Sequence, residues 1–199
     1  MIYDETCTRG WGPIGLTHSW IVGARLYAAL GRLDAWAGAR SWSGALGWLA
    51  RVQPDRAIGE VQFWGHGRWG LAKIDGEVLD ASALEPGHRL NPALQRIRER
   101  MAPEGQWWFR TCETFGARRG QDFARRFTDL MGCAAAGHTH IIGPLQSGLH
   151  RLRPGAVPHW PAEEGVIEGT PDDPRRAAWS SLRAPNTVHC LRGSVPEGW

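Results

Sequence analysis

The chain has 199 residues, of which 42% are hydrophobic and 22% charged, and its net charge is +3. This length predicts one domain, residues 1–199, with the composition of a soluble globular protein. No stretch approaches the ~20 apolar residues that cross a bilayer, which argues against a membrane protein. The start, MIYDET, lacks the basic and apolar segments of a signal peptide. We therefore expect a cytoplasmic protein with free cysteines.

Arginine carries almost all of the positive charge, because 22 arginines accompany one lysine, Lys73. GC-rich coding explains this bias as well as function does, so we expect no nucleic-acid partner. The chain also has twelve tryptophans, more than a core of this size requires. Some of them should line a groove or cleft.

Residues 1–5 predict a short first strand. A helix should then begin at Thr17, whose hydroxyl suits an N-cap, and end at Gly31, which suits a left-handed C-terminal cap. Residues 33–39 predict the next strand. Either Ser41 or Ser43 can cap the second helix that follows.

The middle of the chain continues this alternation. VQFWG, residues 61–65, predicts a short buried strand, and residues 71–80 predict a hairpin that turns at Asp75-Gly76. A third helix should be capped by Asn91, with Pro92 in its first turn.

Strand 106–112, helix 120–132 closed by Gly132, and strand 133–143 complete the series. Alternation of this kind is typical of an α/β protein in which helices cover both faces of a mainly parallel sheet. The predicted fold is thus a three-layer α/β domain whose core comprises residues 1–150.

The composition changes in residues 151–199, which hold seven of the thirteen prolines. We predict a loop-rich C-terminal cover here. It should belong to the same domain, because Trp160, Trp179 and Trp199 would be costly to leave exposed.

Two predicted strand ends carry residues suited to nucleophilic catalysis. The strand VQFWG leads directly to His66-Gly67, and QWWFRT leads to Cys112, 46 residues after His66. Functional groups gather at the carboxyl edge of a parallel sheet. There a Cys112 thiolate could attack a carbonyl while the His66 imidazole moves protons, and backbone N–H groups at Gly67 and Cys112 could bind the oxyanion.

FWGHG after one strand and FRTC after the next, with a hairpin and a helix between them, resemble the caspase-hemoglobinase fold of caspases, metacaspases, gingipains and separases. In caspases the histidine precedes the catalytic cysteine by about 50 residues. The resemblance covers residues 1–150. It implies that His66 is the catalytic histidine and Cys112 the nucleophile of a cysteine peptidase, with no cofactor and no metal.

The resemblance also implies where substrate binds. Arg110, two residues before the cysteine, would line the pocket for the side chain that precedes the scissile bond, and Arg9 could join it in an anion clamp for an acidic side chain. Gln146, Ser147 and Gly148 would form another wall of that pocket.

One departure from the family bears on activity. The sequence has TCETFG where caspases have Gln-Ala-Cys followed by any residue and Gly, and where metacaspases have Asp-x-Cys-His. A Glu113 carboxylate pointing inward would raise the thiol pKa of Cys112 and oppose thiolate formation.

Other interpretations stay open at this point. His138 and His140 lie two apart on a strand, so a third ligand such as Cys133, His150 or His159 would make a zinc hydrolase. Arg110 could instead be a structural ion-pair partner. The arginines of the helix after Cys112, at positions 118, 119, 125 and 126, are typical of a solvated helix face.

The leading prediction is a bacterial-type caspase-like cysteine endopeptidase that acts through His66 and Cys112, with peptides or proteins as substrates and a preference for cleavage after an acidic residue. The alternative prediction is a catalytically inactive caspase-like module that binds a partner through an aromatic cleft.

Overall fold

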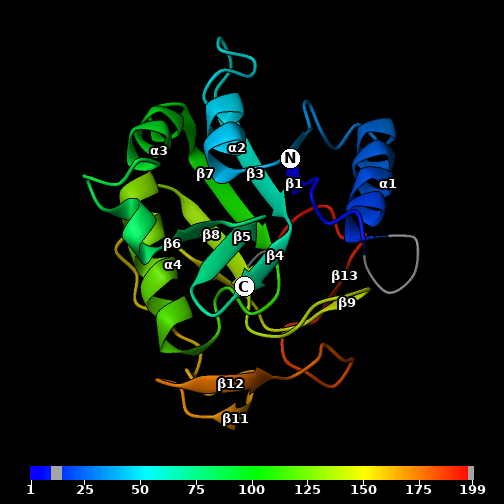
Figure 1. Ribbon diagram of the computed structural model, residues 1–199, viewed down its shortest axis with the longest axis vertical. Coiled ribbons are helices and arrows are strands. Elements are labelled where there is room, and N and C mark those ends of the chain that lie inside the picture. The colour runs from blue at the N-terminus through cyan, green and yellow to red at the C-terminus, as the bar shows by residue number, and fades with distance from the viewer. Residues whose placement is uncertain (10–14, 197–199) are drawn as a thin grey trace.

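The computed structural model describes residues 1–9 and 15–196. Its centre is a six-stranded sheet in the order β10-β8-β7-β3-β1-β2 (Figure 1). Neighbouring strands run parallel except β10, which is antiparallel to β8. The strands are β1 Ile2–Asp4, β2 Ala37–Ala39, β3 Ile58–Trp64, β7 Met101–Arg110, β8 Ala134–His138 and β10 Leu149–Leu152. The predicted α/β class and mainly parallel sheet are confirmed.

Helices lie on both faces of this sheet (Figure 1). On one face, α2 (Trp42–Leu49), α3 (Asn91–Arg98) and α4 (Ala117–Met131) pack over the largest apolar cluster. The other face is covered by α1 (Leu16–Ala29), which packs on Tyr3 and Trp64, and by part of the C-terminal region.

The long strand β7 supplies side chains to both layers. Trp107 and Phe109 face the α2–α4 cluster, whereas Trp108 lies in a separate cluster on the opposite face with Val188. Successive side chains of a strand point to opposite faces, so Arg110 shares the face of Trp108. The face toward α1 and the C-terminal region therefore carries a cation at the end of the central strand.

A second, three-stranded sheet follows β3: β4 (His66–Arg68), β5 (Leu71–Ile74) and β6 (Glu77–Asp80) pair antiparallel. The hairpin predicted at Asp75-Gly76 is confirmed, and Asp75 adopts a left-handed conformation with φ of 51°. A short 3-10 helix, Ala81–Leu84, links this sheet to α3.

Three of the predicted helix signals are confirmed. Gly31 and Gly132 adopt left-handed φ values of 67° and 63° beyond α1 and α4. Ser41, one of the two predicted alternatives, caps α2 by accepting a hydrogen bond from the Gly44 N–H at 3.0 Å.

Two predicted caps are wrong. Thr17 lies inside α1, and its hydroxyl donates to the Asp4 carbonyl at 3.0 Å instead of capping the helix. Asn91 is the first residue of α3, and its side-chain amide donates to the Leu84 carbonyl at 2.7 Å. In both cases a tertiary partner offers the side chain a hydrogen bond that outweighs a local one.

Strand boundaries also differ from the prediction. β7 begins at Met101, which the helical pattern had placed at the end of α3, and it ends at Arg110, before Cys112. β2 spans only Ala37–Ala39, and β8 ends at His138. Cys112 and His140 are thus loop residues.

The C-terminal region forms short antiparallel pairs: β11 (Val166–Gly169) with β12 (Pro174–Ala177), and β13 (Val188–His189) with β9 (Leu145–Gln146). Trp160 is buried, as predicted, and donates its indole N–H to the Phe115 carbonyl at 3.0 Å. The prediction for Trp179 is wrong, because this side chain is 71% exposed. Trp199 lies outside the described residues.

None of the helices in the described part of the chain is long and apolar enough to cross a membrane.

Candidate functional site

The register of the central strands brings the two predicted catalytic residues to the same edge of the sheet. β3 and β7 are adjacent and parallel, and Trp64 pairs with Arg110 where both strands end. His66 follows Trp64 by two residues, and Cys112 follows Arg110 by two. Paired strands lie about 4.8 Å apart, so the two loops leave the sheet side by side.

Gly67 packs directly on the turn that carries Cys112. A Cβ atom at Gly67 would lie 2.5 Å from the Cys112 carbonyl oxygen and 2.3 Å from the Thr114 hydroxyl. Contacts this short allow only glycine without local displacement. The absence of a side chain at Gly67 therefore lets the His66 strand approach the backbone of Cys112.

His66 opens onto a groove of about 670 Å³. The groove runs between the end of β1 and the β4–β6 sheet, and His66, which is exposed, lies on its wall. The edge of the His66 ring contacts Trp20 of α1, with ring centroids 5.7 Å apart. A histidine held by an aromatic neighbour and open to solvent suits proton transfer to a bound ligand.

Cys112 is half-buried, and it is not among the residues that line this groove. Its sulfur lies 3.9 Å from the Ile142 carbonyl oxygen. Burial raises the pKa of the Cys112 thiol and the nearby Glu113 raises it further, while the backbone contact with Ile142 and the residue's own N–H act in the opposite direction. Across residues 1–9 and 15–196 the Cys112 N–H donates to no carbonyl, and it interacts with the sulfur of its own residue.

Glu113 is buried and has left-handed backbone geometry, with φ of 54°. Its N–H donates to the His140 carbonyl at 3.1 Å, which fixes the turn after Cys112. Burial raises the pKa of the Glu113 carboxyl, and Arg68 partly offsets this. A higher carboxyl pKa favours the neutral form, which weakens the opposition to a Cys112 thiolate that the sequence predicts.

Arg110 is only 3% exposed and lies in a polar cage beneath the strand ends. Its terminal nitrogens donate to Tyr27 Oη (3.0 Å), Gln62 Oε1 (3.4 Å), Gln146 Oε1 (3.0 Å) and the carbonyls of Cys190 (2.6 Å) and Arg192 (3.0 Å). The guanidinium also lies between two indole rings, 4.3 Å from the Trp108 centroid and 4.5 Å from that of Trp64.

The cage compensates the charge of Arg110 with dipoles and aromatic faces. Within residues 1–9 and 15–196, no Asp or Glu carboxylate forms a salt bridge with it. Burial lowers the pKa of the guanidinium, and Tyr27 is the largest of the groups that act against this. The interpretation of Arg110 as a structural ion-pair partner is therefore wrong for the part of the chain described.

The other predicted binding residues divide into two groups. Gln146 contacts Arg110 directly, as a shared pocket requires. Ser147 does not reach the pocket, because its side chain is fully buried and bonded to the Ser181 carbonyl and the Thr187 hydroxyl. Arg9 is exposed, and no described hydrogen bond joins it to Arg110, so the structure does not form the predicted clamp.

Gly148, the third predicted wall residue, has a left-handed φ of 61° and packs on Thr139 and His140. A Cβ atom there would lie 1.8 Å from the Thr139 hydroxyl. Gly148 thus serves packing at the end of β8 and does not line the Arg110 cage.

The zinc hypothesis is wrong on the geometry of the histidines. His138 is fully buried, with Nδ1 against the Ser147 carbonyl (3.2 Å) and Nε2 accepting from the Trp108 indole (3.3 Å). Burial lowers the pKa of His138 to about 3. Both of its ring nitrogens are occupied, and no group of three ligand-type side chains converges within residues 1–9 and 15–196.

Two residues near His66 were missed by the sequence analysis. Cys7 lines the same groove as His66. Asp4, at the end of β1, also lines it and is 1% exposed, and its Oδ2 has no partner among the described residues. The proximity of β1 to β3 could have suggested both, had the strand order been known.

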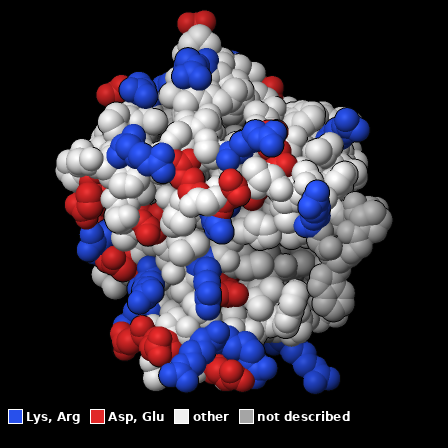
Figure 2. Space-filling view, in the orientation of Figure 1, with Lys and Arg blue, Asp and Glu red and all other residues white. Residues whose placement is uncertain are grey.

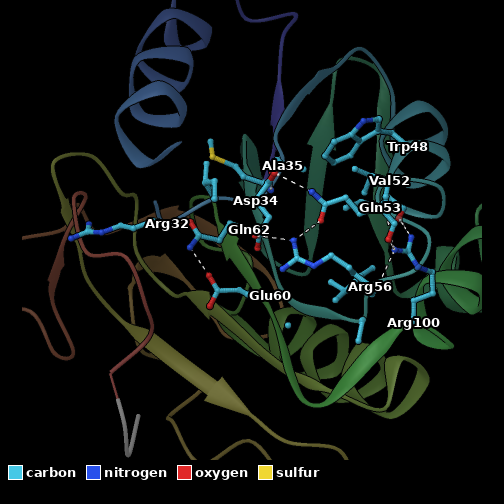
Figure 3. Close-up of a pocket in the computed structure, with 16 residues that line it drawn as sticks. Arg32, Asp34, Ala35, Trp48, Val52, Gln53, Arg56, Glu60, Gln62 and Arg100 are labelled. Carbon is cyan, nitrogen blue, oxygen red and sulfur yellow. Dashed lines mark hydrogen bonds and ion pairs between the residues drawn. The ribbon is translucent and has the colours of Figure 1, made fainter. Parts of the chain in front are cut away.

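A separate cavity of about 180 Å³ lies at the opposite, amino edge of the sheet (Figure 3). Its charged groups engage one another and the backbone: Arg56 pairs with Asp34 at 3.1 Å, and Arg100 donates to the carbonyls of Leu49, Val52, Gln53 and Arg56. These contacts join the segments before β3 and β7, so we interpret this cavity as structural.

Charges of both signs are interspersed over the face seen in Figure 2. The arginines of α4 follow this pattern, since Arg118 pairs with Asp172, Arg125 with Asp122 and Asp129, and Arg126 with Asp122 and Glu85. Their interpretation as a solvated helix face is consistent with these pairs.

Comparison of the chain with protein-family models, with curated proteins and with solved structures finds no match in any of the three.

Proposed function

We propose that the protein is a caspase-like cysteine peptidase that uses His66 and Cys112. The observation that carries this proposal is the contact between Gly67 and the Cys112 turn, at the carboxyl edge of two adjacent parallel strands. Two further features support it. A groove of about 670 Å³ opens beside His66. Arg110, which precedes Cys112 by two residues in the chain, lies in a cage of hydrogen-bond acceptors that includes Gln146.

The chemistry follows from the residue types. Cys112 gives its thiol proton to His66, and the sulfur attacks the carbonyl carbon of the scissile peptide bond. The N–H of Cys112 stabilises the oxyanion once the sulfur has moved to the carbonyl carbon. His66 then protonates the leaving amine, and water hydrolyses the thioester to release an acid and regenerate the thiol.

The arrangement of Arg110 suggests a preference for an acidic residue before the scissile bond. Arg110 and Gln146 are within hydrogen-bond distance of each other, and the guanidinium has no described carboxylate partner. A substrate carboxylate would supply the missing negative charge through strong charge-assisted hydrogen bonds.

Covalent labelling tests the proposal. A peptide electrophile that ends in aspartate should modify Cys112 in the wild-type chain. Cys112→Ala should abolish the labelling and lower any peptide cleavage by at least about a thousandfold. Cys7→Ala is the matched control, because Cys7 lines the same groove and should be dispensable. Labelling that persists in Cys112→Ala and disappears in Cys7→Ala would overturn the assignment of the nucleophile.

One observation favours the alternative function. Burial raises the pKa of the Cys112 thiol, which disfavours the reactive thiolate. The alternative is a catalytically inactive module that binds a partner through an aromatic cleft, in which the partly exposed Trp20 beside His66 would take part. Measurement of the thiol pKa by the pH dependence of iodoacetamide alkylation separates the two functions. A value at or above ~8.5 with slow alkylation supports the binding module, and a lower value supports the peptidase.

A further inference from the structure

The segment that fills the Arg110 cage comes from the end of the described chain. Residues 188–193, the C-terminal strap, begin with β13, which pairs antiparallel with β9. The strap then passes over Arg110 and α1. The Cys190 N–H donates to the Pro144 carbonyl at 2.8 Å, and Pro144 follows Ile142, whose carbonyl contacts the Cys112 sulfur. The strap therefore lies over the arginine and against the segment 142–144, of which Ile142 contacts the candidate nucleophile.

Side chains of the body hold the strap by its backbone. Four consecutive carbonyls accept hydrogen bonds: Cys190 from Arg110, Leu191 from Arg32, Arg192 from Arg110 and Tyr27, and Gly193 from Gln62. Strand pairing combined with recognition of main-chain carbonyls is how proteins bind an extended peptide. The strap thus occupies this site as a peptide ligand would.

The side chains of the strap contribute little to its attachment. Leu191 is 51% exposed, and Arg192 and His189 are also exposed. Only Val188 is buried, against Trp108, Ala136 and Leu149. The attachment therefore depends on hydrogen bonds to the backbone of the strap, three of which come from the guanidinium groups of Arg110 and Arg32 and are charge-assisted.

The cage is better matched to an anion than to the strap. The strap presents neutral carbonyls to a buried guanidinium, whereas a carboxylate would bring a full negative charge and could bind the guanidinium in a bidentate manner. The aromatic rings of Trp64 and Trp108 already fix the plane of the guanidinium. A ligand that brings a carboxylate can therefore compete with the strap.

We propose that the C-terminal strap is an autoinhibitory segment, an internal peptide that an extended peptide with an acidic side chain displaces from Arg110. The strap closes the site until such a peptide binds. This inference rests on the proposed function for the site that the strap covers. The closed state is the one that the structure holds, and the open state exposes Arg110, Gln146 and the strand edge of β9.

Binding to the full-length Cys112→Ala chain tests the strap without turnover. The probe is a capped tetrapeptide amide that ends in aspartate, and its asparagine counterpart is the control ligand. Hydrogen exchange of the amides of residues 188–193 should accelerate with the aspartate peptide and stay unchanged with the asparagine peptide.

Two variants weaken the strap without altering the cage. Val188→Ala removes its buried anchor, and Arg32→Ala removes only the bond to the Leu191 carbonyl. Both should raise the affinity for the aspartate peptide, with Val188→Ala by about tenfold, because the open state becomes more populated. Val157→Ala, at a 78% exposed position outside the strap, is the control for a valine-to-alanine change and should bind as the parent does.

The inference is overturned if the aspartate peptide leaves strap exchange unchanged, if it binds no better than the asparagine peptide, or if the two strap variants bind as the control does. The proposed function fails by a different result, namely the absence of Cys112 labelling in the wild-type chain and in Val188→Ala, even where strap displacement is observed.

Discussion

The open groove at His66 and the filled cage at Arg110 lie at the ends of the same two paired strands, yet they differ in every physical respect. His66 is exposed and contacts Trp20, whereas Arg110 is 3% exposed and donates to five acceptors. The groove is ready to receive a ligand, and the cage already contains one from the same chain. Parallel pairing of β3 and β7 thus places both sites but does not decide which of them is open.

This difference has a simple energetic origin. A neutral histidine can remain in water at little cost, but a guanidinium enclosed by two indoles must find acceptors for its N–H groups. The strap supplies two of those acceptors as carbonyls. The closure of the Arg110 cage is therefore a requirement of the buried charge as well as a means of blocking the site.

Removal of the cation should destabilise the closed side of the comparison strongly. Arg110→Met removes the guanidinium that donates to the Cys190 and Arg192 carbonyls and to Gln146, and we expect a loss of about 3 kcal/mol in the free energy of unfolding. Urea denaturation of the wild type, Arg110→Met and Arg110→Lys measures this loss in the free energy of unfolding. Arg110→Lys keeps the charge and should lie between the two.

The opposite result, an Arg110→Met chain that is as stable as the wild type, also has a physical basis. Burial of a charge without a carboxylate partner carries its own cost, and replacement by an apolar side chain removes that cost. If Arg110→Met proves as stable as the wild type or more so, the hydrogen bonds of the cage do not outweigh desolvation. The strap would then be held by Val188, by its strand pairing and by the hydrogen bonds from Tyr27, Arg32 and Gln62.

Acid should act on the buried support behind the cage. His138 accepts a hydrogen bond from Trp108, which flanks Arg110, and burial lowers the pKa of His138 to about 3. The unfolded chain takes up a proton near pH 6.5, whereas the folded chain does not until about pH 3. The stability contributed by neutral His138 is therefore complete above pH 6.5 and is lost as the pH falls through this range, by an amount on the order of 4 kcal/mol.

His138→Gln isolates this effect, because glutamine can accept from Trp108 and donate to the Ser147 carbonyl without titrating. Between pH 6.5 and 4 its free energy of unfolding should fall less steeply than that of the wild type. His18→Gln, at an exposed position of α1, is the matched control and should keep the wild-type slope. Equal slopes for all three proteins would contradict a buried, neutral His138.

The sequence predicted the class of fold because the local signals agree with the tertiary structure in the core. Gly31 and Gly132 end helices where their left-handed backbone requires glycine, and the Asp75-Gly76 turn closes a hairpin. The helix-facing residues of the sheet are apolar, so their periodicity could be interpreted directly. The predicted caps at Thr17 and Asn91 were wrong because each side chain donates a hydrogen bond to a carbonyl outside its helix, and periodicity does not reveal such a bond.

For the candidate site, the sequence predicted the strand-end positions of His66 and Cys112 but not the surroundings of Arg110. The acceptors on Cys190 and Arg192 are backbone atoms about 80 residues away along the chain, and such contacts carry no sequence signature. Asp4 and Cys7 were missed for a related reason. Their place in the groove depends on strand β1 lying next to β3, a pairing that the order of elements alone does not fix.

The substitution Gly67→Ala tests the groove at His66, which is the open side of the comparison. It has the smallest expected effect on the free energy of unfolding. Gly67→Ala forces the His66 strand away from the Cys112 turn, because the added Cβ would lie 2.5 Å from the Cys112 carbonyl and 2.8 Å from Thr111 Cβ. Overpacking of this kind costs about 1–3 kcal/mol. The rate at which a peptide electrophile labels Cys112 should also fall, and by more than the smaller fraction of folded protein accounts for, since the imidazole moves away from the sulfur.

Gly76→Ala is the matched control in the same small sheet, because a Cβ there meets nothing within 4 Å. Thermal unfolding should place it within about 0.5 kcal/mol of the wild type, and its labelling rate should be unchanged. A Gly67→Ala chain that is destabilised but labels at the wild-type rate would show that the contact serves packing alone. The close approach of Gly67 to the Cys112 turn would then lose its catalytic meaning, while the cage at Arg110 would be unaffected.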